Sequence, residues 1–309
     1  MNTMHFNIAA VERDTGLSKD VLRVWERRYG FPLPARDAHG ERAYSAEQVE
    51  RLRLIKRLMD QGHRPGKLIG ASTAELLALP TKRRNESQTA SPHPQQEDLQ
   101  SMLDYILSHD VTGFQQAMQQ RLTREGLHRF VLDTIAPLTY LIGEAWEQGK
   151  VEVFEEHLFT ELTKRLIRQS IASLPRRHER PRIILTTVPE ELHVLGLWMV
   201  EALLAPEGAE CVPLGTQMPL TEITRAATAH QADIVALSFS VAFPSRQIPE
   251  LLVQLRGLLP PEMELWAGGA GVSRIPEMGG VRLITSLNTA LDELSEWRHS
   301  HSPALVTSR

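Results

Sequence analysis

Cysteine is almost absent from this sequence of 309 residues, since Cys211 is the only one. An internal disulfide framework is therefore impossible. Long apolar runs are also missing, because none approaches the ~18 residues that a membrane-spanning helix needs. The first residues, MNTMHFNIAAVERDTG, lack the basic start and apolar core of a secretory signal peptide. These absences exclude a disulfide scaffold and a membrane protein, and we expect a cytoplasmic globular protein.

Charge is distributed unevenly along the chain. Residues 1–70 contain 13 Lys and Arg against 9 Asp and Glu, whereas the remaining residues contain 21 against 29. A basic head on an acidic body suggests that the head alone has an anionic partner. The length allows two or three domains, at roughly 100–200 residues per domain.

A polar stretch at residues 80–97, PTKRRNESQTASPHPQQE, separates these two parts. It has no apolar period, so it is predicted to be a flexible linker. The domains expected on this basis are a head over residues 1–79 and a body that begins at residue 98.

The head is predicted to contain, in order, a helix, a turn, a second helix, a wing and a third helix. A short helix from Ile8 ends at Gly16, which is a C-cap signal. Ser18 is a good N-cap for a second helix over residues 19–29, and Gly30 ends that helix.

The stretch FPLPARDAHGERAY that follows has two prolines and a glycine, which predicts a loop or a hairpin. Ser45 and Gln48 have the spacing of a capping box. They would start a third helix, in which the apolar residues Val49, Leu52, Ile55 and Leu58 recur at helical spacing.

The body is predicted to have two parts. Residues 98–176 show helical periodicity and are expected to form a helical bundle. From Arg182 onward, short apolar strands alternate with helical stretches of roughly 10–15 residues, which implies a doubly wound, parallel α/β domain of Rossmann-like type over residues 177–300. The strands read RIILTTV, ECVPLG, DIVALSFS, ELWAGG and VRLI.

Cationic side chains gather on the two elements of the head that would meet DNA. The second helix of a helix-turn-helix enters the major groove, and cations in adjacent elements neutralise phosphates on either side. The charges alone leave a solvated helix face as an equal alternative. The cations are Lys19, Arg23, Arg27 and Arg28 on the helix and Arg36, His39 and Arg42 in the wing.

The run LRVWERRYGFPLP, followed by GERAYS, resembles the MerR family of winged-helix regulators over residues 6–70. The resemblance implies that Trp25 and Tyr44 pack in the core. It favours DNA contacts for four arginines, namely Arg23, Arg27, Arg28 and Arg42. One departure is Glu41, where relatives often carry histidine or an apolar residue, and its negative charge is expected to alter base preference at the wing.

A histidine follows the first predicted strand of the α/β domain, in the segment Pro189–Gly196. Open α/β sheets bind ligands at the carboxyl edge of their strands, and His193 would lie there. Its imidazole could ligate a transition metal while Glu191 orients the ring, and Gly196 would allow a bulky ligand to approach the backbone. An ordinary exposed loop histidine is the alternative.

The spacing Glu191-x-His193-x-x-Gly196 resembles the corrinoid-binding signature of methionine-synthase-type cobalamin domains. Two later segments match in order, namely Ser238-Phe239-Ser240 and Gly268-Gly269. The resemblance implies that His193 is the lower axial ligand of the cobalt. It also implies that the nucleotide tail of cobalamin enters a channel lined by Ser238, Ser240, Gly268 and Gly269.

Trp146, followed after nine residues by Glu156 and His157, resembles the upper-face motif of light-sensing, cobalamin-dependent MerR-type repressors of carotenoid genes. The resemblance implies that the motif packs over the adenosyl group of adenosylcobalamin. Trp146 would stack on that group and Glu156 would accept hydrogen bonds from ribose hydroxyls. Ordinary bundle core for Trp146, and a solvated helix start for Glu156 and His157, are the alternatives. In those photoreceptors the residue directly after the tryptophan is a histidine, which captures cobalt after illumination. In this sequence the residue at that position is Glu147.

The function expected from these resemblances is a cobalamin-responsive DNA-binding transcription regulator, a repressor in type, with light as a further signal. Cobalamin would bind between the bundle and the α/β domain and change how protomers assemble into a dimer or tetramer on an operator. Two alternatives stay open: a regulator that keeps the fold without cobalamin, and a corrinoid methyl carrier of a methyltransferase. No nucleophile–base pairing suggests independent catalysis.

Overall fold

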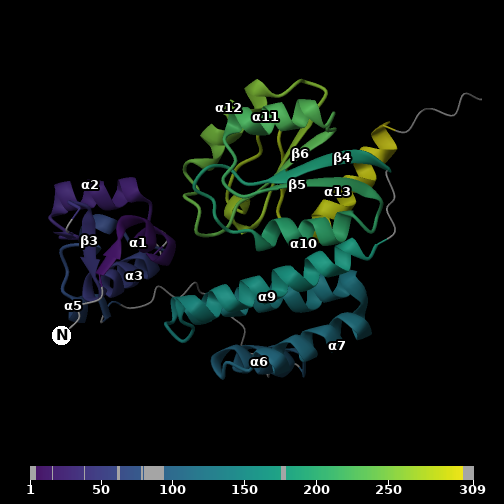
Figure 1. Cartoon of the computed structure of the whole chain (residues 1–309). Helices are drawn as coiled ribbons and strands as arrows, with labels where there is room; N and C mark the ends of the chain where they lie inside the picture. The colour runs from purple at the N-terminus through teal and green to yellow at the C-terminus, as the bar shows by residue number, and fades with distance from the viewer. Residues whose placement is uncertain are drawn as a thin grey trace, which may run out of the picture. The chain divides into compact units, whose positions relative to one another are not determined.

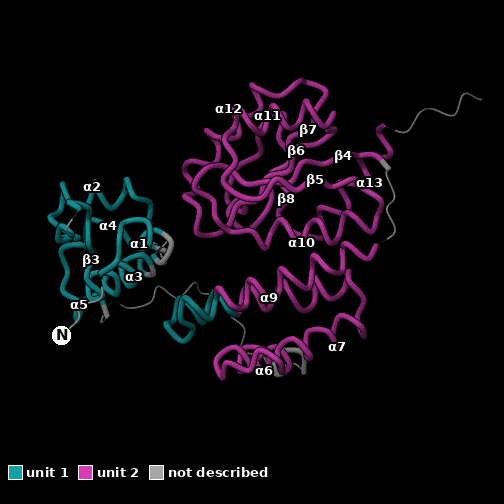
Figure 2. The backbone as a smooth tube through the Cα atoms, in the orientation of Figure 1, with its two compact units in different colours: residues 1–93, 142–156 teal, residues 94–141, 157–309 magenta. Residues whose placement is uncertain are grey.

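A computed structural model describes residues 5–15, 17–37, 39–60, 63–77, 79, 94–174 and 179–301. The chain divides into two compact units (Figure 2), of which one comprises residues 1–93 and 142–156 and the other residues 94–141 and 157–309. Among the described residues, no helix has both the length and the apolar character that crossing a bilayer requires.

The head contains the three predicted helices (Figure 1), α1 (Ile8–Thr15), α2 (Lys19–Tyr29) and α3 (Ala46–Asp60). The wing is a hairpin of β2 (Ala35–Arg36) and β3 (Arg42–Ser45), and β1 (His5–Asn7) pairs with the other side of β3. Strand β1 and the short helices α4 (Pro65–Leu68) and α5 (Thr73–Leu77) were not predicted.

The caps of α2 are those expected from the sequence. The Ser18 hydroxyl accepts a hydrogen bond from the backbone N–H of Val21 at 3.3 Å, and Gly30 ends the helix in the left-handed conformation with φ of 68°. Gly16, the C-cap predicted for α1, lies outside the described residues. The helix that carries most of the cations is therefore defined at both ends.

The predicted capping box of α3 is only half formed. Ser45 accepts a hydrogen bond from the backbone N–H of Gln48 at 3.3 Å, as a box requires. The side-chain amide of Gln48, however, donates to the carbonyl of Leu33 at 2.7 Å instead of reaching back to the N-cap. The prediction of a reciprocal box was wrong because the wing loop competes for the same donor.

One apolar cluster forms the core of the head and joins helices α1, α2 and α3 to strand β3. Trp25 and Tyr44 are both buried, which confirms that they are packing residues. The same cluster contains Val11, Leu17, Leu22, Val49, Leu52, Ile55 and Leu58.

The linker prediction has the wrong carboxyl boundary. Helix α6 (Pro94–Leu107) already begins at Pro94, so residues 94–97 are helical. Proline fits the first turn of a helix, because the N–H that it lacks would have no partner there. Residues 80–93 of the predicted linker lie outside the described residues.

The predicted bundle is built from four helices of 12 to 20 residues and one π-helical segment, η1 (Phe130–Ile135). After α6 come α7 (Val111–Arg129), η1, α8 (Ala136–Glu147) and α9 (Val153–Ala172). Helix α7 is kinked at Gly126, which has φ of 74° and ψ of 158°.

The α/β domain is a five-stranded parallel sheet in the order β5-β4-β6-β7-β8. Helices α11 (Leu220–Ala229) and α12 (Ile248–Leu258) cover one face, and α10 (Leu195–Leu204) and α13 (Leu287–His301) cover the other (Figure 1). The predicted doubly wound fold is confirmed, and its strand order is the flavodoxin-like one. The strands are β4 (Glu179–Thr186), β5 (Ala209–Gly215), β6 (Ile234–Ser238), β7 (Glu264–Gly268) and β8 (Arg282–Ile284).

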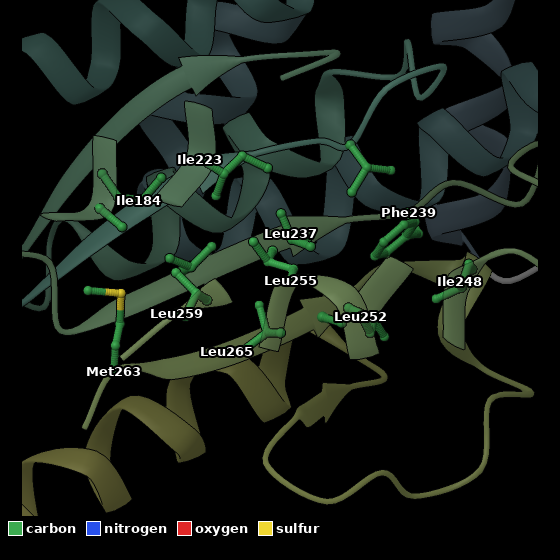
Figure 3. Close-up of a cluster of buried hydrophobic side chains, with 14 of the residues drawn as sticks. Ile184, Ile223, Leu237, Phe239, Ile248, Leu252, Leu255, Leu259, Met263 and Leu265 are labelled. Carbon is green, nitrogen blue, oxygen red and sulfur yellow. The ribbon is translucent and has the colours of Figure 1, made fainter. Parts of the chain in front are cut away.

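Apolar residues fill both sides of this sheet, as expected for parallel strands covered by helices. Figure 3 shows part of one cluster, which includes Ile223 of α11, Leu237 of β6 and Leu252 of α12. The opposite cluster includes Leu204 of α10 and Trp297 of α13. The sheet is therefore a rigid base for the loops at its ends.

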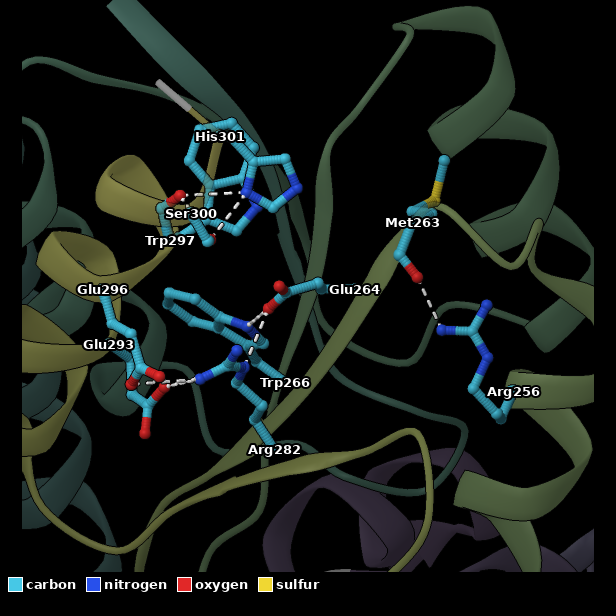
Figure 4. Close-up of polar contacts among 10 residues, drawn as sticks. All are labelled: Arg256, Met263, Glu264, Trp266, Arg282, Glu293, Glu296, Trp297, Ser300 and His301. Carbon is cyan, nitrogen blue, oxygen red and sulfur yellow. Dashed lines mark hydrogen bonds and ion pairs between the residues drawn. The ribbon is translucent and has the colours of Figure 1, made fainter. Parts of the chain in front are cut away.

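Ion pairs fasten the amino ends of the last two strands (Figure 4). Arg282 pairs with Glu264 at 3.0 Å and also contacts Glu293 and Glu296 of α13. The indole N–H of Trp266 donates to the same Glu264 at 2.8 Å. The edge strand β8 is thus tied to its neighbour and to α13, at the end of the sheet away from His193.

Candidate cofactor site and DNA-reading face

The carboxyl ends of β4, β6 and β7 are adjacent in the sheet, and the loops that leave them carry the candidate cofactor residues. The chain that leaves β4 runs to β5 on one side, whereas the chain that leaves β6 runs to β7 on the other side, so the topological switch point of the sheet lies between β4 and β6. Ligands bind at such points in open α/β folds. The structure therefore brings together segments that are about 50 residues apart in the sequence.

Glu191 holds the histidine loop and the loop after β6 together. One carboxylate oxygen accepts the backbone N–H of His193 at 2.9 Å and lies 2.7 Å from its Nδ1. The other oxygen accepts the backbone N–H of Ser240 at 2.8 Å and its hydroxyl at 2.9 Å. The Ser240 hydroxyl also lies 2.9 Å from Nδ1 of His193. The predicted pair of Glu191 and His193 is thus a three-residue cluster.

Glu191 is only 1% exposed. Burial opposes ionisation, but hydrogen bonds from His193 and Ser240 more than offset it and hold the pKa of Glu191 below its ordinary value. A carboxylate at this position favours a proton on Nδ1 of His193, which leaves the lone pair on Nε2. An imidazole that is oriented in this way, and whose side chain is 58% exposed, presents a nitrogen that can ligate a transition metal.

Glycines allow close backbone approach along the same edge. A Cβ atom on Gly269, which has φ of 94°, would lie 2.4 Å from the carbonyl oxygen of Phe239, and one on Gly196 would lie 2.5 Å from the hydroxyl of Ser238. A Cβ on Gly271 would lie 2.5 Å from the carbonyl of Ser240, a constraint that was not predicted. At Gly268 the nearest atoms would be 3.4 Å away, which is ordinary contact. The small residues therefore allow the loops of this edge to pack against one another, and the histidine held by Glu191 is a donor that fits a metal-bearing ligand.

Thr187 braces the histidine loop and was also missed. Its buried hydroxyl donates to the carbonyl of Glu191 at 2.7 Å and accepts the backbone N–H of Gln217 at 2.8 Å. The loops after β4 and β5 are therefore joined through Thr187. A polar residue at the end of an apolar strand was the only signal for it in the sequence.

The residues of the predicted upper-face motif lie at the ends of two helices. Trp146 and Glu147 are partly buried in the last turn of α8. Glu156 is partly buried and His157 is exposed near the start of α9. Their roles toward an adenosyl group stay predictions.

The exposed face of α2 carries the predicted DNA contacts. Arg23, Arg27 and Arg28 are exposed, and Arg23 pairs with Asp20 at 3.2 Å. Lys19 lies 3.3 Å from Glu12 of α1. In the wing, Arg36 donates to the carbonyl of Gly40 at 2.9 Å.

Arg42 of the wing is fixed more firmly than the other candidate cations. Its Nε lies 2.7 Å from the carboxylate of Glu26 on α2, and each side chain is about one-quarter exposed. The hydrogen bond that Arg42 donates to Glu26 raises the pKa of Arg42. This pair joins the wing to the recognition helix across 16 residues of sequence, and the sequence did not predict Glu26 as part of the surface.

Comparison with known proteins finds family matches to three segments of the chain. The family described as "MerR HTH family regulatory protein" matches residues 6–70. Two families, each described as "B12 binding domain", match residues 99–169 and residues 181–283.

Two relatives from Myxococcus xanthus match most of the chain. The HTH-type transcriptional repressor CarH is 32% identical over 272 residues, which are 87% of this chain and 89% of CarH. The HTH-type transcriptional repressor CarA is 26% identical over 295 residues, which are 95% of this chain and 94% of CarA. Among solved structures, the monomethylamine corrinoid protein of Methanosarcina barkeri matches 65% of this chain and 99% of its own, with a TM-score of 0.54 and 18% identity. That likeness shows the fold.

Proposed function

The chain belongs to the family of MerR-type transcriptional regulators with B12-binding domains, and from this premise we propose that it is a repressor whose occupancy of an operator is set by adenosylcobalamin. It is a cobalamin-responsive, DNA-binding regulator with a MerR-type head. One observation carries the proposal: head and B12-binding domains occur in one chain that aligns with CarH over 87% of its length. We also propose that the protein is located in the cytoplasm, where such a regulator would meet DNA.

The cofactor site is proposed to be the carboxyl edge of the sheet. Cobalamin, when bound, would supply a cobalt centre that accepts a nitrogen ligand. His193 would provide that nitrogen through Nε2, and Glu191 would hold the ring in the required tautomer. Ser238, Ser240, Gly268 and Gly269 would line the entry for the tail. Trp146, Glu156 and His157 are proposed to contact the upper ligand.

The head is proposed to bind double-stranded DNA through the α2 helix and the wing. Phosphate neutralisation by surface cations gives affinity that falls with salt. The Glu26–Arg42 pair would keep the wing in a fixed position relative to α2, so that both elements meet the duplex together. The contacts are assigned to Lys19, Arg23, Arg27, Arg28, Arg36 and Arg42.

Control is proposed to act through the number of heads in one assembly. Two heads held in one oligomer bind neighbouring sites with a high effective concentration, so that occupancy changes without any change in the head. A dimer or tetramer that forms with the cofactor would supply this gain.

An enzyme role is the competing assignment, because corrinoid proteins share the fold of the body. A methyl carrier has no use for a DNA-reading head, and residues 6–70 match the MerR family. The curated relatives that match most of the chain are transcriptional repressors. We therefore propose that the protein is not an enzyme.

The test measures assembly and DNA occupancy on the same sample. Purified protein with and without adenosylcobalamin, kept dark or illuminated, is examined by light scattering for mass and by gel shift for operator binding. We expect mass and occupancy to change together on cofactor addition. A colourless protein that binds DNA regardless of added cofactor would support the cobalamin-independent alternative.

A further inference from the structure

Two large apolar side chains are exposed beside the candidate axial ligand. Leu192 is 49% exposed and Val241 is 62% exposed. Leu192 lies between Glu191 and His193 in the chain, and Val241 directly follows Ser240.

The hydrogen bonds of the cluster join the two loops that carry these side chains. Glu191 accepts hydrogen bonds from both the backbone N–H and the hydroxyl of Ser240, so the loops after β4 and β6 cannot separate without breaking two partly buried hydrogen bonds. Thr187 adds a third bond to the backbone of Glu191. Leu192 and Val241 are therefore carried by two loops that hydrogen bonds join to each other, and each directly follows one of the two bonded residues.

We propose that Leu192 and Val241 form an apolar seat for the lower face of a corrin ring, beside the nitrogen ligand from His193. This inference rests on the proposed cofactor site. A corrin is a broad, flat macrocycle with methyl groups around its rim, and it covers whatever surrounds its axial ligand. Burial of exposed apolar area gives affinity, and a seat on fixed loops needs no ordering when the ring arrives.

The proposal predicts that different residues determine cobalamin affinity and metal coordination. His193 determines the coordination of the metal, whereas Leu192 and Val241 contribute only contact area. A change in the seat should weaken every corrinoid by the same factor, whatever its upper ligand. It should also weaken cobinamide, which has the ring but no nucleotide tail.

The experiment uses the full chain and the variants Leu192→Asp and Val241→Asp. Each is titrated with adenosylcobalamin, hydroxocobalamin and aquocobinamide, and the dissociation constant and the absorption spectrum at saturation are recorded. We expect binding about tenfold weaker for each variant with all three corrinoids, and an unchanged spectrum of histidine ligation. Val253→Asp is the matched control, because Val253 is also 62% exposed but lies on α12.

Unchanged dissociation constants in both Asp variants would overturn the seat while leaving the cobalamin function intact. A loss confined to one upper ligand, or to corrinoids with a tail, would also overturn it. A wild-type protein that binds none of the three would instead contradict the proposed function. If an Asp variant fails to fold by circular dichroism, Leu192→Ala and Val241→Ala remove the area without adding charge, and the expected loss is about threefold.

Discussion

Arg23 in the head and Glu191 in the body are both paired ionisable side chains, but water surrounds only one of them. The Arg23 side chain is 53% exposed and its partner Asp20 is 89% exposed. Glu191 is 1% exposed and accepts four hydrogen bonds from two residues. The head thus holds its charges where another charged surface can reach them, and the body holds its charge where only its own loops can.

This difference sets how each site is expected to respond to change. Exposed pairs are screened by salt and contribute little to folding, so the cations of the head are available to phosphates. A buried carboxylate has no water to replace a lost partner, so the body depends on geometry. Substitutions should therefore affect folding strongly in the body, and mainly DNA affinity in the head.

The largest effect is expected for Glu191→Ala. Removal of the carboxylate leaves the N–H groups of His193 and Ser240 without their acceptor, which should lower the free energy of unfolding by about 4 kcal/mol at pH 7. Because the pKa of Glu191 is lowered in the folded state, this contribution exists above the ordinary carboxyl pKa and disappears as pH falls through the lowered value. Urea unfolding across pH measures both.

The control for that variant is Glu222→Ala. Glu222 pairs with Arg225 on the surface of α11 at 2.6 Å, so its loss should change stability little. Equal losses in the two variants would erase the contrast between buried and exposed pairs.

A stabilising effect is expected from Glu201→Gln in α10. Burial raises the pKa of Glu201 to about 7, although Arg168 opposes the shift. The wild-type protein loses stability as pH rises from the ordinary carboxyl pKa through 7, since the buried side chain must then ionise. At pH 8 the glutamine variant should be more stable by about 3 kcal/mol, and the gain should shrink toward pH 5. A gain independent of pH would show that the charge of Glu201 is not its cause.

A smaller effect, on DNA binding, is expected from Arg23→Ala and Arg42→Ala. Each should weaken operator binding about fivefold and lower the salt dependence by about one counterion. Fluorescence anisotropy over a salt series measures both quantities. Loss of affinity with an unchanged salt slope would mean that the arginine does not contact phosphate.

The smallest effect is expected from Asp20→Asn. This change removes the exposed partner of Arg23 but no buried contact, so thermal stability should stay the same within error. DNA affinity should rise slightly, because a negative charge leaves the reading face. Clear destabilisation would show that this surface pair is structural.

The parts of the fold that the sequence predicted well are those defined by nearby residues. Ser18 and Gly30 mark the ends of α2 because caps act within one turn of the helix. Strand β1 was missed because three residues carry no alternating pattern, and its pairing partner, β3, is about 40 residues away.

In the sites too, contacts between residues close in the sequence were predicted, and contacts between distant residues were not. Glu191 and His193 are two residues apart, so their pairing was visible in the sequence. The bond between Glu191 and Ser240 spans 49 residues, and the Glu26–Arg42 pair spans 16. Such pairs depend on how strands and helices are placed in space, which a local pattern does not contain.

The central claim is that the state of the His193 site controls the DNA affinity of the head. It is tested most directly by the dissociation constant for a DNA fragment selected from a random pool, measured with and without adenosylcobalamin for the wild-type protein and for His193→Ala. The account predicts that cofactor changes DNA affinity in the wild type, and that the variant, with weakened cobalamin binding, loses this response while it binds DNA as the cofactor-free wild type does. Equal DNA affinities for wild-type protein with and without cobalamin, in a sample whose absorption spectrum proves that cofactor is bound, would contradict it.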